Sequence, residues 1–210
     1  MPKVAYSESE REQIKKALID TGLKLFSTQG IQRTTVEQIY QNVGISRTFF
    51  YSFFPAKEDL VIQAFYRQQP QMLVYAKSLM EDPKLSWRAS AAQFLRQICY
   101  GGQEGFTIMS VEEQQALFKC LSDEERQEFQ RKRLTFFTEL IQILGIHTEE
   151  SNIKLLGNLV FSAAILHKAI PDTLPFLFAE ASDEMIDFQI ETILEYMETL
   201  YEQSKNKESK

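Results

Sequence analysis

The sequence predicts an all-α fold, in which a three-helix head precedes a larger helical bundle. Apolar residues recur at the i, i+3, i+4 spacing of a helix along most of the 210 residues. No segment shows the strict period-two alternation of a strand, and glycine, proline or serine breaks the pattern where helices should begin or end. These observations divide the chain into two predicted domains, residues 1–60 and residues 61–210.

The head begins with an amphipathic helix over about residues 9–28. Its apolar stripe consists of Ile14, Ala17, Leu18, Thr21 and Leu25, and charged residues occupy the other side. Gly30 follows the stripe, where helices commonly end, and Thr34 or Thr35 supplies an N-cap for the next helix.

Two short helices complete the head, over about residues 35–42 and 46–53. The buried face of the first consists of Val36, Ile39, Tyr40 and Val43. Gly44 then permits a tight turn to Ser46, the N-cap of the second. Two short helices separated by a glycine turn, after a longer one, are typical of a helix-turn-helix over about residues 35–53.

Longer helices follow the head. The first begins near Ala56, ends near Glu81 and is expected to kink at Pro70. The others are predicted at about residues 86–101, 111–121, 123–144, 149–169 and 183–203, with breaks at Gly101-Gly102, Ser122-Asp123, Gly145 and Pro171 to Pro175. The polar tail from Gln203 is expected to fray.

Composition narrows the class of protein. With 44% hydrophobic and 25% charged residues the chain has the composition of a globular protein, and no apolar stretch reaches the roughly 20 residues of a membrane span. The N-terminus lacks the apolar core of a signal peptide, which favours a cytoplasmic location. The net charge of −6 divides into +1 for residues 1–60 and −7 for the remainder, so the head is the less acidic part.

The third helix of the head has two chemically different faces. Phe50 and Phe53 point toward the core, with Phe49 at their edge. The solvent side holds Arg47, Thr48, Tyr51 and Ser52. A guanidinium, two hydroxyls and a phenol can bind base edges and phosphates in the DNA major groove. Arg47 is the candidate for reading guanine, and Lys57, in the first turn of the next helix, is a candidate phosphate ligand.

The stretch from Ile14 to Leu60 resembles the DNA-binding domain of the tetracycline-repressor (TetR) family. The matching positions are Ala17, Phe26, Gly30, Thr34-Thr35-Val36, Ile39, Gly44-Ile45-Ser46, Tyr51, Phe54-Pro55, Lys57 and Leu60. The resemblance implies DNA-facing side chains at Arg47, Thr48, Phe49, Tyr51 and Ser52, a backbone contact by Thr35 and a phosphate contact by Lys57. It also implies a homodimer on a palindromic double-stranded operator, with a second domain that pairs subunits and binds a small molecule.

The chain departs from the family pattern at Tyr40, Thr48 and Phe49, where alanine, glycine and threonine are usual. Phe49 has two interpretations, because its ring can meet a thymine methyl group or join the core. The alternative for the whole helix is an aromatic-rich bundle helix on which Arg47 and Lys57 are ordinary solvated charges.

Two late apolar stripes are candidates for the dimer interface. They consist of Leu156, Val160, Ala163 and Ala164 on one helix and Ile190, Ile193, Leu194 and Met197 on the other. Small residues such as Ala163 and Ala164 would permit close approach of helices. The alternative is that both stripes face the core of their own subunit.

An effector pocket is predicted from aromatic and methionine side chains of the second domain. The candidates are Trp87, Phe94, Tyr100, Phe106, Met109, Phe118, Phe137 and Phe161. Gly101-Gly102 and Gly105 would let the chain bend around a ligand, which we expect to be apolar, aromatic or lipid-like. The alternative is that these side chains only form core.

No metal or cofactor site is expected, because Cys99, Cys120, His147 and His167 complete no recognisable ligand motif. The chain has no phosphate-binding loop or nucleophile elbow, so it is not expected to be an enzyme. The expected function is a ligand-responsive repressor, in which an effector shifts the helix beginning near Ala56 and weakens DNA binding. The alternative is a helical protein-interaction module without DNA binding.

Overall fold

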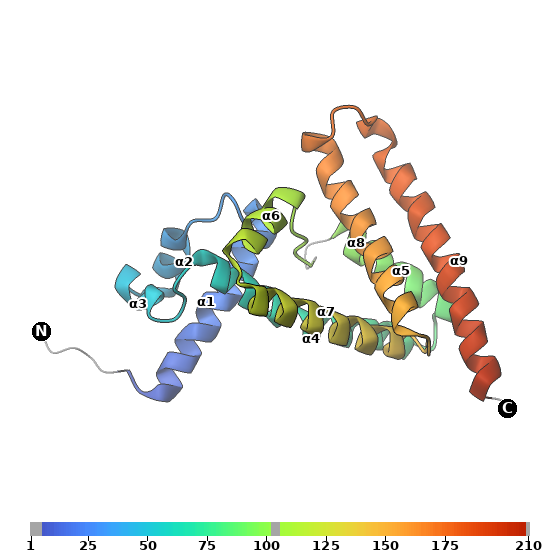
Figure 1. Ribbon diagram of the computed structural model, residues 1–210, viewed down its shortest axis with the longest axis horizontal. Helices are drawn as coiled ribbons and strands as arrows, with labels where there is room; N and C mark the ends of the chain where they lie inside the picture. Colours follow the sequence, from blue (N-terminus) through green and yellow to red (C-terminus); the bar gives the residue numbers. More distant parts are fainter. Residues whose placement is uncertain (1–5, 102–105, 209–210) are drawn as a thin grey trace, which may run out of the picture. The chain divides into compact units, whose positions relative to one another are not determined.

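The computed structural model describes residues 6–101 and 106–208, and these residues contain helices and turns but no strand. The α-helices are α1 (Glu8–Gln29), α2 (Val36–Val43), α3 (Arg47–Tyr51), α4 (Lys57–Met80), α5 (Trp87–Tyr100), α6 (Val111–Cys120), α7 (Asp123–Ile143), α8 (Glu150–Thr173) and α9 (Ser182–Glu208). A short 3₁₀ helix, Ala179–Ala181, precedes α9. The predicted all-α class is confirmed, and Figure 1 shows the helices in chain order.

The helices begin within one residue of their predicted starts, because the signals that start a helix are local. Caps that accept a backbone N–H of the first turn are supplied by Ser7, Thr35, Ser46, Ser86, Ser110 and Ser122. Each cap of this kind stabilises its helix by about 1 kcal/mol. Gly44 ends α2 in the left-handed conformation, with a φ of 76°, and allows the turn into α3.

Two helices end later than the sequence predicts. α8 continues through Thr173 and α9 through Glu208, whereas the predicted ends were near residues 169 and 203. Ser204 supplies a reason for the second difference, because its hydroxyl accepts the His147 N–H at 2.8 Å and its side chain is buried. This bond ties the last turns of α9 to the loop between α7 and α8. The bend expected at Gly102 and Gly105 lies outside the described residues.

The chain folds into two compact units, Met1–Gln69 and Pro70–Lys210, and α4 contributes residues to both. The core of the first unit includes Leu18, Phe26, Ile39, Phe50, Phe54 and Leu60. Gly22 permits the close packing of α1 on the start of α4, because a Cβ at this position would lie 2.6 Å from the Leu60 Cδ2 atom.

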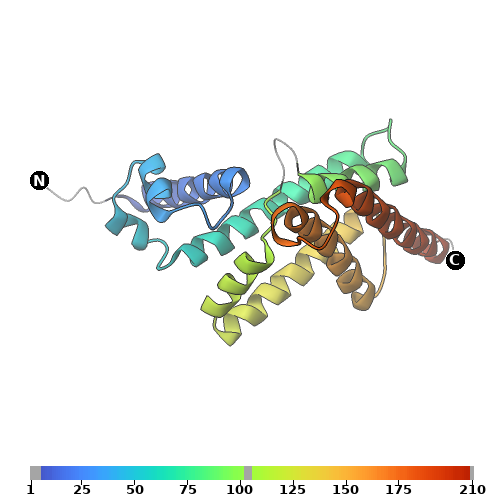
Figure 2. The same cartoon turned by 90° about the horizontal axis from the view of Figure 1, so that it is seen from above.

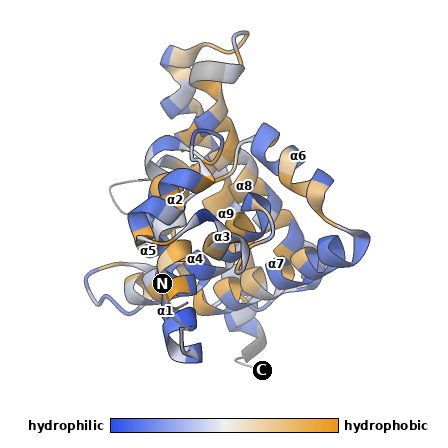
Figure 3. Cartoon of the chain, turned by 90° about the vertical axis from the view of Figure 1, so that its left-hand side faces the viewer, coloured by the Kyte–Doolittle hydropathy of each residue, from blue (hydrophilic) through white to orange (hydrophobic). Residues whose placement is uncertain are grey.

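The second unit is a bundle of α5 to α9 and the end of α4. α8 and α9 lie side by side as a hairpin, and α5 packs against both (Figures 1 and 2). Fully or almost fully buried side chains include Phe94 and Leu95 of α5, Leu156 and Ala163 of α8, and Ile186, Ile190 and Leu194 of α9. Figure 3 shows hydrophilic and hydrophobic residues along α7, as expected for a helix with one packed face.

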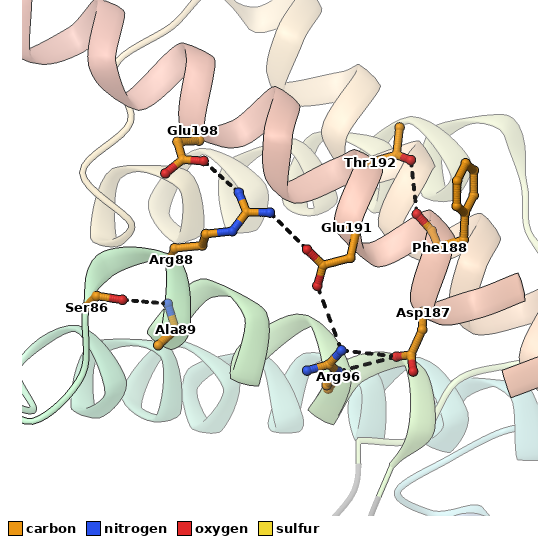
Figure 4. Close-up of polar contacts among 9 residues, drawn as sticks. All are labelled: Ser86, Arg88, Ala89, Arg96, Asp187, Phe188, Glu191, Thr192 and Glu198. Atoms are coloured by element: carbon orange, nitrogen blue, oxygen red, sulfur yellow. Dashed lines mark hydrogen bonds and ion pairs between the residues drawn. The ribbon is translucent and has the colours of Figure 1, made fainter. Parts of the chain in front are cut away.

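An ion-pair network joins α5 to α9. The Arg88 guanidinium binds Glu191 at 2.9 Å and Glu198 at 2.6 Å, and Arg96 binds Asp187 at 3.3 Å (Figure 4). These side chains are 37–50% exposed, so water and salt screen the pairs and each adds little to stability. The network therefore links the exposed sides of two helices that already pack through buried side chains.

Candidate nucleic-acid interface

α3 is anchored by two aromatic rings and exposes its opposite side. Phe50 is fully buried and Phe54, just after the helix, is 2% exposed. The exposed residues are Arg47, Thr48, Tyr51 and Ser52, which are the predicted solvent side. A helix of five residues has no stability of its own, so the buried rings hold this polar face in place.

Arg47 and Tyr51 lie next to each other on the exposed side of α3. The Arg47 guanidinium carbon is 5.8 Å from the centre of the Tyr51 ring, and that side chain is 40% exposed. Within the described part of the chain Arg47 contacts no carboxylate, so its forked N–H donors face solvent. A stacked, uncompensated guanidinium is a suitable group for binding guanine or phosphate.

Ser52 and Thr35 use part of their hydrogen-bonding capacity within the protein. The Ser52 hydroxyl donates to the Phe49 carbonyl at 2.7 Å. The Thr35 hydroxyl accepts the Gln38 N–H at 3.1 Å and caps α2. The Thr35 hydroxyl proton is not used by that bond, and it lies at the positive end of the α2 dipole, where a phosphate would be stabilised.

Lys57 lies partly buried at the start of α4. Its ammonium donates to the carbonyl of Ile31 in the segment between α1 and α2. Lys57 thus connects the start of α4 to the segment that leads into α2. An ammonium has three donors, and the predicted phosphate contact would add to this internal bond.

Phe49 lies in an aromatic cluster that the sequence did not predict. Its ring stacks on Tyr6 with centres 4.7 Å apart and meets Phe53 edge-on at 5.0 Å. The guanidinium of Arg11 lies over both Phe49 and Phe53, at 5.4 and 4.6 Å from the ring centres. Phe49 is half-buried in this cluster. This position is closer to a ring packed in the core than to a fully exposed ring that contacts a thymine methyl group.

Most of the predicted pocket residues pack in the core of the second unit or bind other parts of it. Phe94 is 1% exposed and Met109 6% exposed. The Trp87 indole N–H donates to the Leu144 carbonyl at 2.7 Å and the ring stacks on Tyr201. The Tyr100 hydroxyl donates to the Asp183 carbonyl at 2.9 Å.

The remaining pocket candidates make ring contacts in the same unit. Phe106 meets Tyr75, Phe118 meets Phe129, and Phe137 meets Phe161, each in an edge-to-face arrangement. Of the eight candidates, Phe137 lines a surface groove that is described below.

The structure corrects the predicted dimer residues. Seven of the eight are at most 4% exposed in the isolated chain: Leu156, Ala163, Ala164, Ile190, Ile193, Leu194 and Met197. Val160 is half-buried. Both stripes face the core of their own subunit, because α8 and α9 pack against α5 and against each other. A buried side chain cannot also contact a second subunit.

The second unit exposes large apolar side chains outside the two predicted stripes. Phe176 is 98% exposed and Phe178 77% exposed in the turn before α9, and Phe188 of α9 is 73% exposed. Helical periodicity did not point to Phe176 and Phe178, because they lie in a turn outside the helices.

α8 corrects the expectation that no segment is long and apolar enough to span a membrane. The stretch Glu150–Ile170 has a mean hydropathy of 1.4. Its residues Ile153, Leu156 and Ala163 belong to the core of the second unit, and core helices commonly have this composition. Among the described residues no group of three or more His, Cys, Asp or Glu side chains could hold a metal ion.

Comparisons with known proteins agree with this geometry. Residues 18–64 match the family described as bacterial regulatory proteins, tetR family. A stretch of 76 residues is 32% identical to the uncharacterized HTH-type transcriptional regulator YuxN of Bacillus subtilis (strain 168). This stretch covers 35% of the chain and 26% of that relative, so the similarity spans about a quarter of the relative's length.

Solved structures resemble the chain over most of its length. A TetR transcriptional regulator from Legionella pneumophila has a TM-score of 0.53 at 15% identity, over 90% of this chain and 98% of that one. A TetR-family regulator from Cytophaga hutchinsonii has a TM-score of 0.55 at 15% identity, over 93% and 98%. The reduced form of E. coli NemR has a TM-score of 0.55 at 12% identity, over 90% and 96%. At these identities the similarity shows the fold.

Proposed function

We propose that this chain is a sequence-specific DNA-binding transcriptional regulator, and the match of residues 18–64 to the family of bacterial regulatory proteins, tetR family, supports the proposal. The observation that carries the proposal is the polar side of α3. Arg47, Thr48 and Tyr51 are exposed there, while Phe50 on the opposite side is fully buried. A rigid short helix with an exposed guanidinium and hydroxyls suits entry into the major groove.

Contacts with the DNA backbone would position α3 in the groove. We assign them to the Thr35 hydroxyl, which lies at the start of α2, and to the Lys57 ammonium at the start of α4. Arg47 is the proposed base-reading residue, with Thr48, Tyr51 and Ser52 as additional contacts. Phe49 has a supporting role in this proposal, because its ring holds α3 against Tyr6 and Arg11.

We propose that the regulator is a homodimer on a palindromic operator, since two copies of α3 can then read successive major grooves. The exposed rings of Phe176, Phe178 and Phe188 support self-association, because burying them against a second subunit would remove apolar surface from water. This surface replaces the buried stripes of α8 and α9 as the proposed contact.

We propose that the protein is a repressor and that a small, largely apolar or lipid-like effector relieves repression. It would act in the cytoplasm by binding and not as an enzyme. α4 offers a link between DNA binding and effector binding, because it begins at Lys57 in the first unit and ends at Met80 in the second. A coupling of about 1–3 kcal/mol between effector and DNA binding would be typical.

The experiment is a gel shift and footprint with DNA that flanks the gene of this protein, at low and moderate salt. The expected result is binding that weakens steeply with salt and protects two half-sites about 10 base pairs apart. If the folded protein binds no DNA at low salt, the proposal fails and the alternative of a protein-interaction module is favoured.

A further inference from the structure

A surface groove lies between α7 and α8, away from the residues assigned to the predicted pocket except Phe137. Its volume is about 420 Å³, which falls in the range of about 300–1,000 Å³ typical of small-molecule sites. It is lined by Gln130, Arg131, Arg133, Leu134 and Phe137 of α7 and by Ile153, Lys154, Gly157 and Asn158 of α8. The two helices pack against each other in Figure 1.

The inner part of the groove is apolar. Leu134, Phe137 and Ile153 contribute their side chains to it, and the Phe137 ring is held edge-on to Phe161 with centres 5.5 Å apart. Gly157 leaves room for this ring, because a Cβ there would lie 3.1 Å from two of its carbons. The apolar part is therefore a fixed surface on which a hydrocarbon or aromatic body can rest.

The rim of the groove carries positive charge and amides, and no carboxylate lines it. Two of its cations are compensated on their own helices, since Arg131 pairs with Glu128 and Lys154 with Glu150. These two pairs leave Arg133 as the cation of the rim that lacks an acidic partner.

Arg133 is half-buried beside the apolar surface. In the described residues its guanidinium contacts the Asn158 amide oxygen at 3.3 Å and no carboxylate. Burial lowers the pKa of Arg133, which reflects a cation that has lost water without gaining a counter-charge. An anion beside Arg133 would supply the missing counter-charge. The planar fork of guanidinium N–H donors fits a carboxylate.

We propose that the groove binds an amphipathic carboxylate, with the carboxylate on Arg133 and the apolar body on Leu134, Phe137 and Ile153. The opposite orientation would leave the guanidinium uncompensated and expose the apolar body. The assignment of this ligand as the effector rests on the proposed function, whereas the binding site itself rests on the groove alone.

The test is calorimetric titration of the full chain with decanoate, and with 1-decanol as a ligand of equal chain length without charge. We expect decanoate to bind and decanol to bind at least about tenfold more weakly, as for the loss of a hydrogen bond to a charged group. Arg133→Met should weaken decanoate binding by about ten- to hundredfold. The control is Lys77→Met, which removes a cation of α4 that pairs with Glu81 outside the groove and should leave the affinity unchanged.

Equal binding of decanoate and decanol, or unchanged binding by a folded Arg133→Met variant, would overturn the proposal. So would a change in the sedimentation coefficient of ligand-free Arg133→Met, because the groove would then be an interface between copies. DNA binding is measured on the same samples. Decanoate binding without any DNA binding contradicts the proposed function alone, and DNA binding without decanoate binding contradicts the site alone.

Discussion

The two units expose opposite kinds of chemistry. The first exposes a polar side on α3, with Arg47, Thr48 and Tyr51 around a helix that Phe50 anchors. The second exposes aromatic rings, with Phe176 and Phe178 in the turn before α9. Hydrogen-bonding groups on a rigid helix suit nucleic acid, whereas exposed rings suit another apolar surface. We therefore propose that DNA recognition and subunit pairing are performed by separate parts of the chain.

The largest effect on stability is expected at Phe50, the buried ring that holds α3 and its polar side in place. Phe50→Ala removes a fully buried ring and should lower the free energy of unfolding of the first unit by about 3–5 kcal/mol. DNA binding should be lost with it. Chemical denaturation followed by circular dichroism measures the change, and the exposed Tyr51→Phe variant should unfold like the parent.

The second prediction compares a buried residue of the second unit, Leu194, with an exposed one, Phe188. Leu194→Ala should lower the free energy of unfolding by about 2–5 kcal/mol, because Leu194 is fully buried in the single chain. Phe188→Ser, at a 73% exposed position, should instead weaken self-association and leave the stability of the subunit nearly unchanged.

Sedimentation velocity and thermal unfolding on both variants distinguish these outcomes. If Leu194→Ala dissociated a dimer of otherwise stable subunits, Leu194 would belong to the subunit interface and not to the core of its own subunit.

Local signals explain why the helices could be predicted and their partners could not. Gly44 ends α2 and Ser46 caps the start of α3, so the polar side of α3 followed from helical geometry. The stripe around Leu194 is equally clear in sequence, but periodicity only shows that one side of a helix is covered. Whether α5 or a second subunit covers it depends on tertiary packing.

Long-range contacts explain the parts of the candidate sites that the sequence did not indicate. Tyr6 and Arg11 reach Phe49 from about forty residues away, with no motif that links them. The groove at Arg133 combines side chains of α7 and α8, and it depends on Arg133 having no acidic partner among the described residues. Neither arrangement has a spacing rule that one sequence could reveal.

A smaller effect is expected at the end of α9. Ser204→Ala removes the acceptor of the His147 N–H and should lower the free energy of unfolding by about 1 kcal/mol. Hydrogen exchange should show faster opening of the last turns of α9, with α1 unaffected. Unchanged protection there would contradict the reason given for the late end of this helix.

The smallest effect on stability is expected at the helix caps, which have the same form at the start of α1 in the first unit and of α7 in the second. Backbone N–H donation from Ser7 lowers the pKa of Glu10, and from Ser122 that of Glu125, below the ordinary value of 4.5. A lowered pKa in the folded state stabilises the protein above pH 4.5, and that contribution is lost as the pH falls through the folded value. Urea unfolding between pH 7 and 3 should therefore show a shallower acid loss for Glu125→Gln than for the parent. Equal slopes would mean that this carboxylate does not hold the cap.

The central claim is that the exposed side of α3 reads DNA sequence, and paired affinities test it most directly. Dissociation constants of parent, Arg47→Ala and Lys57→Ala would be measured on the footprinted site and on unrelated DNA of equal length. Arg47→Ala should lose about 1–3 kcal/mol on the specific site and much less on unrelated DNA, whereas Lys57→Ala should weaken both similarly. Arg47→Ala binding the specific site as tightly as the parent would contradict the claim.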